Sequence, residues 1–493
     1  MSGSFHGEYA DEKAVIEQVE QIATGRAEID PVAEKRLLRK LDLIILPQVT
    51  LLFLLNFIDR NASAAGFQKD LKLSVPKYEY NVALMVFYIF YIIGEIPSNL
   101  VLKKVGSKWL SFLCMAFGAV TIGSAWVHNF QTFLGVRILL GIFEGGVIPG
   151  IVYLLTRFYT RQELAFRVGV FLSLGPGLSG AFGGLLAAGF LNASVGSLRT
   201  WQKIFVCEGI ITCGYGIISF FIIPTSPEST RWLNEEERAL AVRRLEIEHL
   251  GQVHEKTTTK AVLKAIANPF TWACTFAYGF INVIVQGTSL FLPTIIAGLG
   301  KYTTTEVQLR SVPPYIVSAV WAVGVSYICW KTKRHGLCIA SSVVLSIIGY
   351  IMFLASDNPK VLYGASFLTF TGALPCGPFF LAWATANAGS PTARAVTAAI
   401  VPAWGSWGSM ACTWLYFYVE LLLPQYKPRY IPGNSFNVAS GACAALIAIG
   451  LTLYCQWENR QRDAGRRDHR LEGLTPEQAR DLGYRHPSYR LLI

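Results

Sequence analysis

The sequence predicts an all-α membrane protein with twelve transmembrane helices arranged in two six-helix bundles. Apolar runs of about 20 residues, the length that crosses a bilayer as a helix, recur between positions 41 and 456. Only 15% of the 493 residues are charged and 52% are hydrophobic, whereas a soluble domain carries about 25% charged residues. The longest internal polar stretch, 224–269, divides the runs six and six. These observations exclude a soluble enzyme, a disordered chain and a small disulfide-rich secreted domain.

The spans are separated by charged or Pro/Gly-rich breaks, which give their approximate limits. In the first half we expect spans at 42–65, 80–102, 108–127, 130–153, 166–191 and 202–223. In the second half we expect them at 270–292, 312–330, 337–355, 361–385, 395–419 and 436–456. The predicted organisation is an amino-terminal segment 1–40, a bundle 41–223, a linker 224–269, a second bundle 270–456 and a tail 457–493.

The distribution of basic residues predicts the orientation. The chain has 43 Lys and Arg against 32 Asp and Glu, a net charge of +11. No basic stripe interleaved with exposed aromatic residues is present, so a nucleic-acid partner is not expected. Segments on the amino-terminal side of the membrane hold 31 basic residues, and segments on the other side hold 10. The excess of Lys and Arg in cytoplasmic loops therefore predicts that both termini are cytoplasmic.

The linker contains a predicted helix. Asn234 can cap it, Glu235, Glu236 and Glu237 form its first turn, and Arg243 and Arg244 follow. Acidic residues first and basic residues last suit the helix dipole. We interpret it as a surface helix that tethers the two bundles; the alternative is a helix that binds a partner protein.

The cysteines and glycines indicate packing. All ten cysteines lie within or beside apolar runs, without a CxxC pair or a histidine at ligand spacing, so we expect no metal or other cofactor. Small residues recur at helical spacing, as in Gly141 and Gly145 or Gly175, Ser179 and Gly183. Such stripes allow close contact between membrane helices.

Four charged residues lie inside the spans of the first half, where a charge costs at least about 2.5–3.5 kcal/mol. Asp59 and Arg60 lie in the first span, and Arg137 and Glu144 lie in the fourth. A spacing of seven is nearly two turns, so Arg137 and Glu144 share one helix face with Gly141. The group can be a structural ion pair between helices 1 and 4, or a combined site for an anion and a proton.

The chemistry favours the second interpretation. Arginine stays protonated and offers a planar fork to a carboxylate. A carboxyl group in a partly dry cavity can bind a proton near neutral pH, because burial favours its neutral form and a nearby arginine opposes it. Arrival of an anion at the arginine weakens that opposition, so the anion and the proton can bind together.

Other polar and aromatic residues are weaker candidates. Glu95, near the cytoplasmic end of the second span, is a candidate gate residue. Helices 7 to 10 have no central charged residue, and they and helix 11 offer Tyr278, Asn282, Gln286, Trp383 and Trp404. Many such rings pack or lie at the membrane interface. If some line the cavity, one half binds charge and the other an apolar or planar body, which suits a small organic anion.

Several motifs, in order along the chain, resemble those of the major facilitator superfamily, specifically its anion:cation symporter branch and the fungal allantoate permease family. They are FIDRNASAAG, GEIPSNLVLKKVGSKW, RILLGIFEGGVIPG, SPESTRWLNEEERALAVRRL, SLFLPTIIAGLG, VPPYIVSAV, NAGSPTARAV and LGYRHPSYR. The family includes nicotinate, pantothenate and biotin transporters, and its members are proton-driven importers that work by alternating access. The resemblance implies that Asp59 and Glu144 carry protons and that Arg60 and Arg137 bind substrate.

Two positions depart from the family pattern. The loop after helix 2 usually contains an aspartate, where this chain has Lys103 and Lys104, so the usual charge contact of that gate is in doubt. In helix 11, relatives often have Gly-Asn where this chain has Gly405-Ser406, beside Trp404. We therefore expect a bulkier and less polar substrate pocket that includes Ser406.

The sequence thus predicts a monomeric, proton-coupled importer of a small organic anion in a fungal plasma membrane. The alternatives are an exporter of a specialised metabolite and a nutrient receptor that does not transport. A membrane-embedded enzyme is disfavoured, because no GxSxG, HExxH or P-loop is present.

Overall fold

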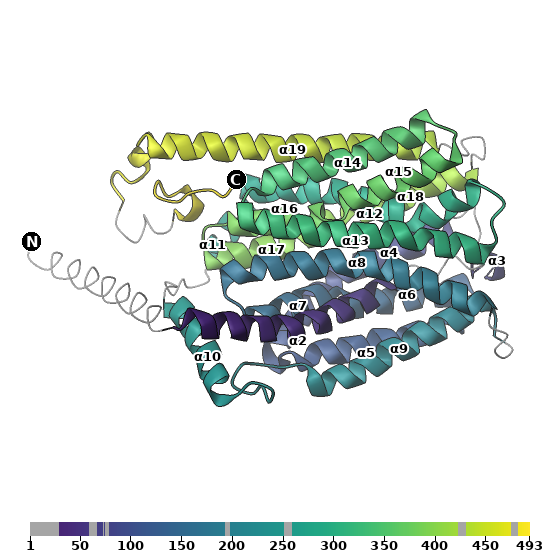
Figure 1. Cartoon of the computed structure of the whole chain (residues 1–493), viewed down its shortest axis with the longest axis horizontal. Helices are drawn as coiled ribbons and strands as arrows, with labels where there is room; N and C mark the ends of the chain where they lie inside the picture. Colours follow the sequence, from purple (N-terminus) through teal and green to yellow (C-terminus); the bar gives the residue numbers. More distant parts are fainter. Residues whose placement is uncertain are drawn as a thin grey trace, which may run out of the picture.

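The computed structural model describes residues 29–58, 67–71, 73, 78–192, 198–250, 259–422, 430–474 and 482–493, and these contain helices and turns without a strand. The long helices run along one direction, and α2 begins at the same end of the molecule at which α19 ends (Figure 1). We call this the terminal end, and the opposite one the far end. Both ends of the helical region thus lie on one side, as the basic-residue count predicted.

The amino-terminal half contains six membrane-length helices, the fourth of which is split. They are α2 (Pro31–Ile58), α4 (Glu79–Val105), α5 (Lys108–Ser124), α6 (Phe130–Gly145) with α7 (Val147–Thr156), α8 (Arg161–Asn192) and α9 (Thr200–Ile222). The short helix α3 (Phe67–Asp70) lies at the far end.

The carboxy-terminal half contains six more, of which two are split. They are α12 (Pro269–Gly298), α13 (Thr304–Thr332), α14 (His335–Ala355), α15 (Pro359–Ala373) with α16 (Cys376–Ala386), α17 (Pro391–Gly405) with α18 (Trp407–Leu422), and α19 (Ile431–Asp463). Each predicted span overlaps one helix or one split pair, so the twelve-helix prediction is confirmed.

Several helices extend beyond their predicted spans. Helix α2 begins at Pro31 rather than 42, α13 at Thr304 rather than 312, and α19 continues to Asp463 rather than 456. Hydropathy marks the part that lies in the hydrocarbon, whereas the helix continues through charged residues outside it. Residues 59–65 of the first predicted span lie outside the described residues, because α2 is described only to Ile58.

Glycine allows α4 and α6 to pack backbone to backbone. A methyl group on Gly141 would lie 2.5 Å from the carbonyl oxygen of Phe87, and one on Gly94 would lie 2.6 Å from that of Ile142. The close contact predicted from Gly141 and Gly145 is therefore made with α4, which fixes the register of α6 against it.

The main interface between the halves is formed by α8 and α13. A methyl group on Gly177 would lie 3.0 Å from the Ala319 β-carbon, and one on Gly184 would lie 3.1 Å from the carbonyl oxygen of Gln308. Gly175, by contrast, faces the Phe53 ring of α2. The glycines that contact the other half, Gly177 and Gly184, therefore lie beside the predicted stripe rather than in it.

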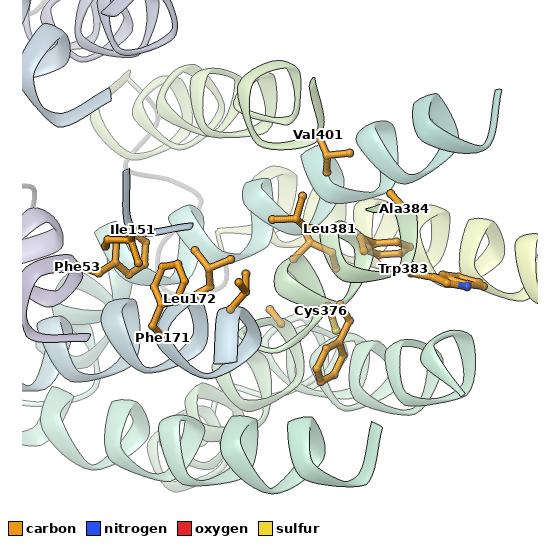
Figure 2. Packing of buried hydrophobic residues seen from close by; sticks show 14 of the residues in the cluster. Phe53, Ile151, Phe171, Leu172, Cys376, Leu381, Trp383, Ala384 and Val401 are labelled. Carbon is orange, nitrogen blue, oxygen red and sulfur yellow. The ribbon is translucent and has the colours of Figure 1, made fainter. Parts of the chain in front are cut away.

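At the far end, α4 and α18 connect the halves. The Asn81 side-chain amide donates to the carbonyl of Thr413 at 2.9 Å, and the rings of Tyr78 and Trp414 lie 5.7 Å apart. Buried apolar residues form a core with members in both halves. Figure 2 shows Phe53 and Leu172 from the amino-terminal half with Leu381 and Trp383 from the other. All ten cysteines are free thiols.

The linker is divided between the halves. Helix α10 (Glu235–Leu250) is attached to the amino-terminal half, because Arg244 pairs with Glu34 at 2.6 Å and also with Glu163. Helix α11 (Thr259–Ile266) packs on α17 in the carboxy-terminal half. At the start of α10, the Asn234 backbone N–H donates to the Glu237 carboxylate at 2.9 Å, which is half of the expected capping arrangement.

Candidate functional site

Helix α6 places a buried arginine and a buried glutamate on one face. The helix begins at Asn129, whose side chain accepts the Thr132 backbone N–H at 2.8 Å. Arg137 is 3% exposed and Glu144 is 1% exposed. With a rise of 1.5 Å per residue, they lie roughly 10 Å apart along the helix axis. The Arg137 guanidinium lies over the Phe133 ring, 5.0 Å from its centre.

Glu144 immediately precedes the break between α6 and α7. The break lies at Gly146, where a side chain would collide with the Ser98 hydroxyl of α4. That hydroxyl also accepts the Trp109 indole N–H at 2.8 Å. The backbone around Glu144 is therefore held by α4, so the carboxyl group is positioned by packing between two helices.

Asp59 and Arg60 lie outside the described residues. Helix α2 is described as far as Ile58, directly before them, and Asn56 one turn earlier is fully buried. The prediction that all four charged residues share one site therefore stays a prediction.

Glu95 is buried in α4 beside the last turn of α6. It is 6% exposed, and its backbone nitrogen would lie 3.3 Å from a methyl group on Gly145. Its role as a gate residue stays a prediction. Lys103 and Lys104 lie in the last turn of α4 at the terminal end, where the Lys104 side chain is exposed; the Lys103 side chain lies outside the described set.

Three of the residues predicted in the other half meet around the break between α17 and α18. The Asn282 amide donates to the carbonyl of Gly405 at 3.1 Å, and the Tyr278 ring packs against Gly405 and Gly377. The Ser406 hydroxyl donates to the carbonyl of Pro402 at 2.8 Å. These polar groups stabilise a helix break in addition to any contact with a substrate.

Gln286 connects the two halves. Its side-chain amide donates to the Tyr88 hydroxyl of α4 at 3.0 Å, and both residues are buried. Sequence reasoning missed Tyr88, because a tyrosine in an apolar run is indistinguishable from an interfacial or packing ring. The only available signal was a phenol placed well inside a span.

The two predicted tryptophans, Trp383 and Trp404, differ in their burial and their contacts. Trp383 is fully buried, and its indole N–H donates to the carbonyl of Leu492 at 2.8 Å. Trp404 is 63% exposed, with its ring 6.0 Å from that of Trp272. Because the single polar group of Trp383 is bonded at the terminal end and Trp404 lies on the outside of α17, we do not carry either into the proposed substrate site.

A small cavity of about 220 Å³ opens at the far end of the amino-terminal half. Asp70, Arg199 and Trp201 line it, and Asp70 accepts the Trp201 indole N–H at 2.7 Å and pairs with Arg199 at 3.2 Å. Phe67 packs between Trp201 and Phe133, so the same aromatic cluster that lies beneath Arg137 supports this cavity.

Comparisons with known proteins agree with this architecture. Residues 49–413 match the family model of the Major Facilitator Superfamily. The chain is 32% identical to the MFS transporter prlL of a fungus (strain NRRL 50135), over 94% of this chain and 97% of that protein. It is 29% identical to the high-affinity nicotinic acid transporter of Saccharomyces cerevisiae, over 94% and 86% of the two chains. The solved proton:xylose symporter XylE is similar in fold, with a TM-score of 0.63, 18% identity and coverage of 82% of this chain and 94% of that one.

Proposed function

This chain belongs to the major facilitator superfamily, and from that premise we propose that it imports a small organic anion together with protons by alternating access. Within the superfamily we propose membership of the anion:cation symporter branch and its allantoate permease family. The observation that carries the proposal is the burial of Arg137 and Glu144, 3% and 1% exposed, on one face of α6. A buried fixed cation and a buried carboxyl group are what a combined anion and proton site requires.

The proposed substrate is a monocarboxylate with a planar or apolar body. Arg137 supplies the cation, and the face of the Phe133 ring already accepts its guanidinium, as an aromatic substrate ring also can. Tyr278 and Asn282 supply an aromatic surface and an amide in the opposite half. The relative named for nicotinic acid, an aromatic monocarboxylic acid, supports this substrate class.

Coupling follows from the distance between the two buried groups. At about 10 Å and an effective dielectric constant of about 20, two unit charges interact by ~1.7 kcal/mol. Without bound substrate, the charge of Arg137 therefore disfavours protonation of Glu144, and a bound carboxylate cancels this effect. The gain is about 15- to 20-fold in the constant for proton binding, because 1.36 kcal/mol corresponds to a factor of ten. Substrate and proton thus promote each other's binding.

The test is transport in liposomes that contain the purified protein, with acid outside. We expect accumulation of nicotinate or another aromatic monocarboxylate from a labelled panel, and no accumulation of nicotinamide, its neutral counterpart. No pH-driven accumulation of any carboxylate would refute the proposal. Acid-driven loss of a preloaded compound against its gradient would support the exporter alternative instead. If one proton enters with each monoanion, uptake is insensitive to membrane potential; a second proton adds about 2.3 kcal/mol per 100 mV.

Two substitutions test the assigned residues. Glu144→Gln is expected to abolish pH-driven accumulation while exchange at equal pH on both sides continues. Glu208→Gln is the matched control, because Glu208 in α9 is 2% exposed and equally buried. Arg137→Lys should weaken apparent affinity at least about tenfold, since a point charge does not replace a planar fork. Full pH-driven accumulation by Glu144→Gln would remove the proton role.

A further inference from the structure

Residues 484–493, which we call the strap, lie across the terminal end of the carboxy-terminal half (Figure 1). They contain most of the LGYRHPSYR motif, which the transport proposal leaves unexplained. The strap has no regular helix beyond one short turn at Gly483–Arg485. Its backbone is nevertheless bonded to three separate helices, so it is an ordered structural element.

The strap is bonded most fully to α16. The Asn387 side chain binds both backbone groups of Leu492, accepting its N–H at 2.8 Å and donating to its carbonyl at 3.1 Å. The Trp383 indole N–H donates to the same carbonyl at 2.8 Å. The Tyr489 hydroxyl donates to the carbonyl of Ala386 at 2.8 Å. The last turn of α16 is therefore bonded to the strap by two side chains and one carbonyl.

The strap is also bonded to α14 and α19. The His335 backbone N–H, at the start of α14, donates to the carbonyl of Ile493 at 2.7 Å. The Asn459 side chain of α19 binds both backbone groups of Leu491, at 2.8 and 2.9 Å. The Leu491 side chain is 5% exposed. Two asparagines thus bind the backbone N–H and carbonyl of two consecutive residues, which fixes the register of the strap.

A buried charge cluster holds the start of the strap. The Arg462 side chain of α19, 1% exposed, donates to the carbonyl of Tyr484 at 3.0 Å and to that of Tyr489. It pairs with Glu458, 2% exposed, at 3.2 Å, and Glu458 also pairs with Arg467 and Arg470. A buried arginine that donates to two strap carbonyls would lose these partners if the strap detached, so detachment is opposed by desolvated polar groups.

The strap connects the terminal part of a split helix with two unbroken helices. Helix α16 is the shorter, terminal part of a helix that is split at Leu374 and Pro375, and it contacts α8 of the other half. A methyl group on Gly177 of α8 would lie 3.2 Å from the Leu374 side chain. Helix α16 packs directly on α12, α14 and α17, and the strap adds directional hydrogen bonds that tie its last turn to α14 and α19.

We propose that the strap makes α14, α16 and α19 move as one body, and that Asn387 and Trp383 are positioning residues that set the turnover of the transporter through α16. The described bonds of the strap are with α14, α16 and α19, none of which carries Arg137 or Glu144, so it changes the rate of the conformational step and leaves substrate affinity unchanged. The proposal does not depend on the identity of the substrate.

The first measurement is trypsin cleavage of the purified full-length protein after Arg485, an exposed strap residue. The double variant with Asn387→Ala and Asn459→Ala is expected to be cleaved at least tenfold faster than the wild type. Ser488→Ala is the matched control, because its side chain is exposed and contacts His486 within the strap. Equal cleavage rates in the double variant and the control would overturn the proposal, and this measurement needs no substrate.

The second measurement is transport, together with hydrogen exchange of α16. We expect the double variant to lose at least fivefold in maximal rate with an unchanged Michaelis constant, and to exchange faster in α16. Trp383→Phe keeps the ring and removes one bond, so it should fold and show a smaller loss; Asn387→Gln should restore part of the rate. Faster cleavage with unchanged turnover, or a raised Michaelis constant, would overturn the positioning role.

Discussion

Gly141→Ala tests whether the face that carries Arg137 and Glu144 is held by the contact between α4 and α6. A methyl group there would lie 2.5 Å from the Phe87 carbonyl oxygen and 3.0 Å from the Tyr91 nitrogen. Ordinary contact begins at 3.4 Å, so the helices must separate by roughly 0.9 Å. Both obstructing atoms belong to the backbone, so no side-chain rotation can relieve the collision.

The loss of stability caused by Gly141→Ala is estimated by comparison with Gly135→Ala in the same helix, where nothing lies within 4 Å of the added methyl group. Both substitutions gain the same helix propensity, about 0.8–1.0 kcal/mol. Only Gly141→Ala also incurs the cost of overpacking, typically about 1–3 kcal/mol. The difference between the two variants is therefore about 1–3 kcal/mol, and the propensity gain cancels.

The assay is thermal unfolding of both variants in the same detergent at the same scan rate, because unfolding of such proteins is irreversible and depends on the rate. At about 2–4 °C per kcal/mol for a bundle of this size, Gly141→Ala should unfold about 2–12 °C below Gly135→Ala. It should also slow transport, because Glu144 moves with α6. Equal midpoints and equal transport would show that α4 does not position this face.

Three further outcomes are expected. Arg244→Ala should speed hydrogen exchange in α10, because the arginine is 3% exposed and pairs with two glutamates. Lys40→Ala removes a partly exposed ion pair and should change the exchange rate of α10 little. Gln286→Leu and Tyr88→Phe should give a coupling energy of about 0.5–1.5 kcal/mol in a double-mutant cycle, and additivity would mean that the bond is not formed. Burial raises the pKa of Glu237, but the hydrogen bond with Lys40, the bond from the Asn234 backbone N–H and the Lys40 charge together outweigh this and hold the pKa below the ordinary 4.5. The first turn of α10, which Glu237 caps through Asn234, should therefore be fully stabilised above pH 4.5 and exchange faster as the pH falls through the lower folded-state pKa, a step that Glu237→Gln should abolish in hydrogen exchange measured against pH.

The spans could be predicted from the sequence because the bilayer fixes their length, but the splits within them could not. Gly146, Leu374 and Ser406 interrupt helices in the middle of apolar runs, where hydropathy is continuous. At Gly146 the Ser98 hydroxyl of α4 occupies the space of a side chain, a contact between residues far apart in the chain. Pro375 and Pro402 lie beside the other two splits, but Pro176 lies inside the unbroken helix α8, so a proline alone does not predict a split.

The candidate site shows the same division. Arg137 and Glu144 were identified because a charge in hydrocarbon is costly, and both are buried on one face of α6. For Trp383 the sequence leaves the location open, because an aromatic ring in a span fits equally well in a cavity, at the interface or against another segment. Its partner is Leu492, whose carbonyl lies more than a hundred positions along the chain. A charged residue in a span therefore predicts a buried polar site, because its transfer into hydrocarbon costs free energy. An aromatic residue carries no such cost, so its presence in a span predicts little about its surroundings.

The contacts between the halves differ in kind from one helix pair to another, and this difference bears on alternating access. Between α4 and the carboxy-terminal half, the described residues form polar contacts: one amide to the Thr413 carbonyl, one ring pair, and deeper in the bundle the bond from Gln286 to Tyr88. Two such hydrogen bonds are worth about 1–3 kcal/mol together. One proton moving through 100 mV supplies about 2.3 kcal/mol, which is comparable with the cost of breaking these two bonds. Helix α8 meets α13 through glycines and apolar side chains, from Gly184 near the far end to Gly177 in the middle, and such contacts allow helices to slide without breaking directional bonds. The strap instead bonds α16 to α14 and α19 through directional hydrogen bonds, so we expect α16 to keep its place in the carboxy-terminal half when α8 slides against it.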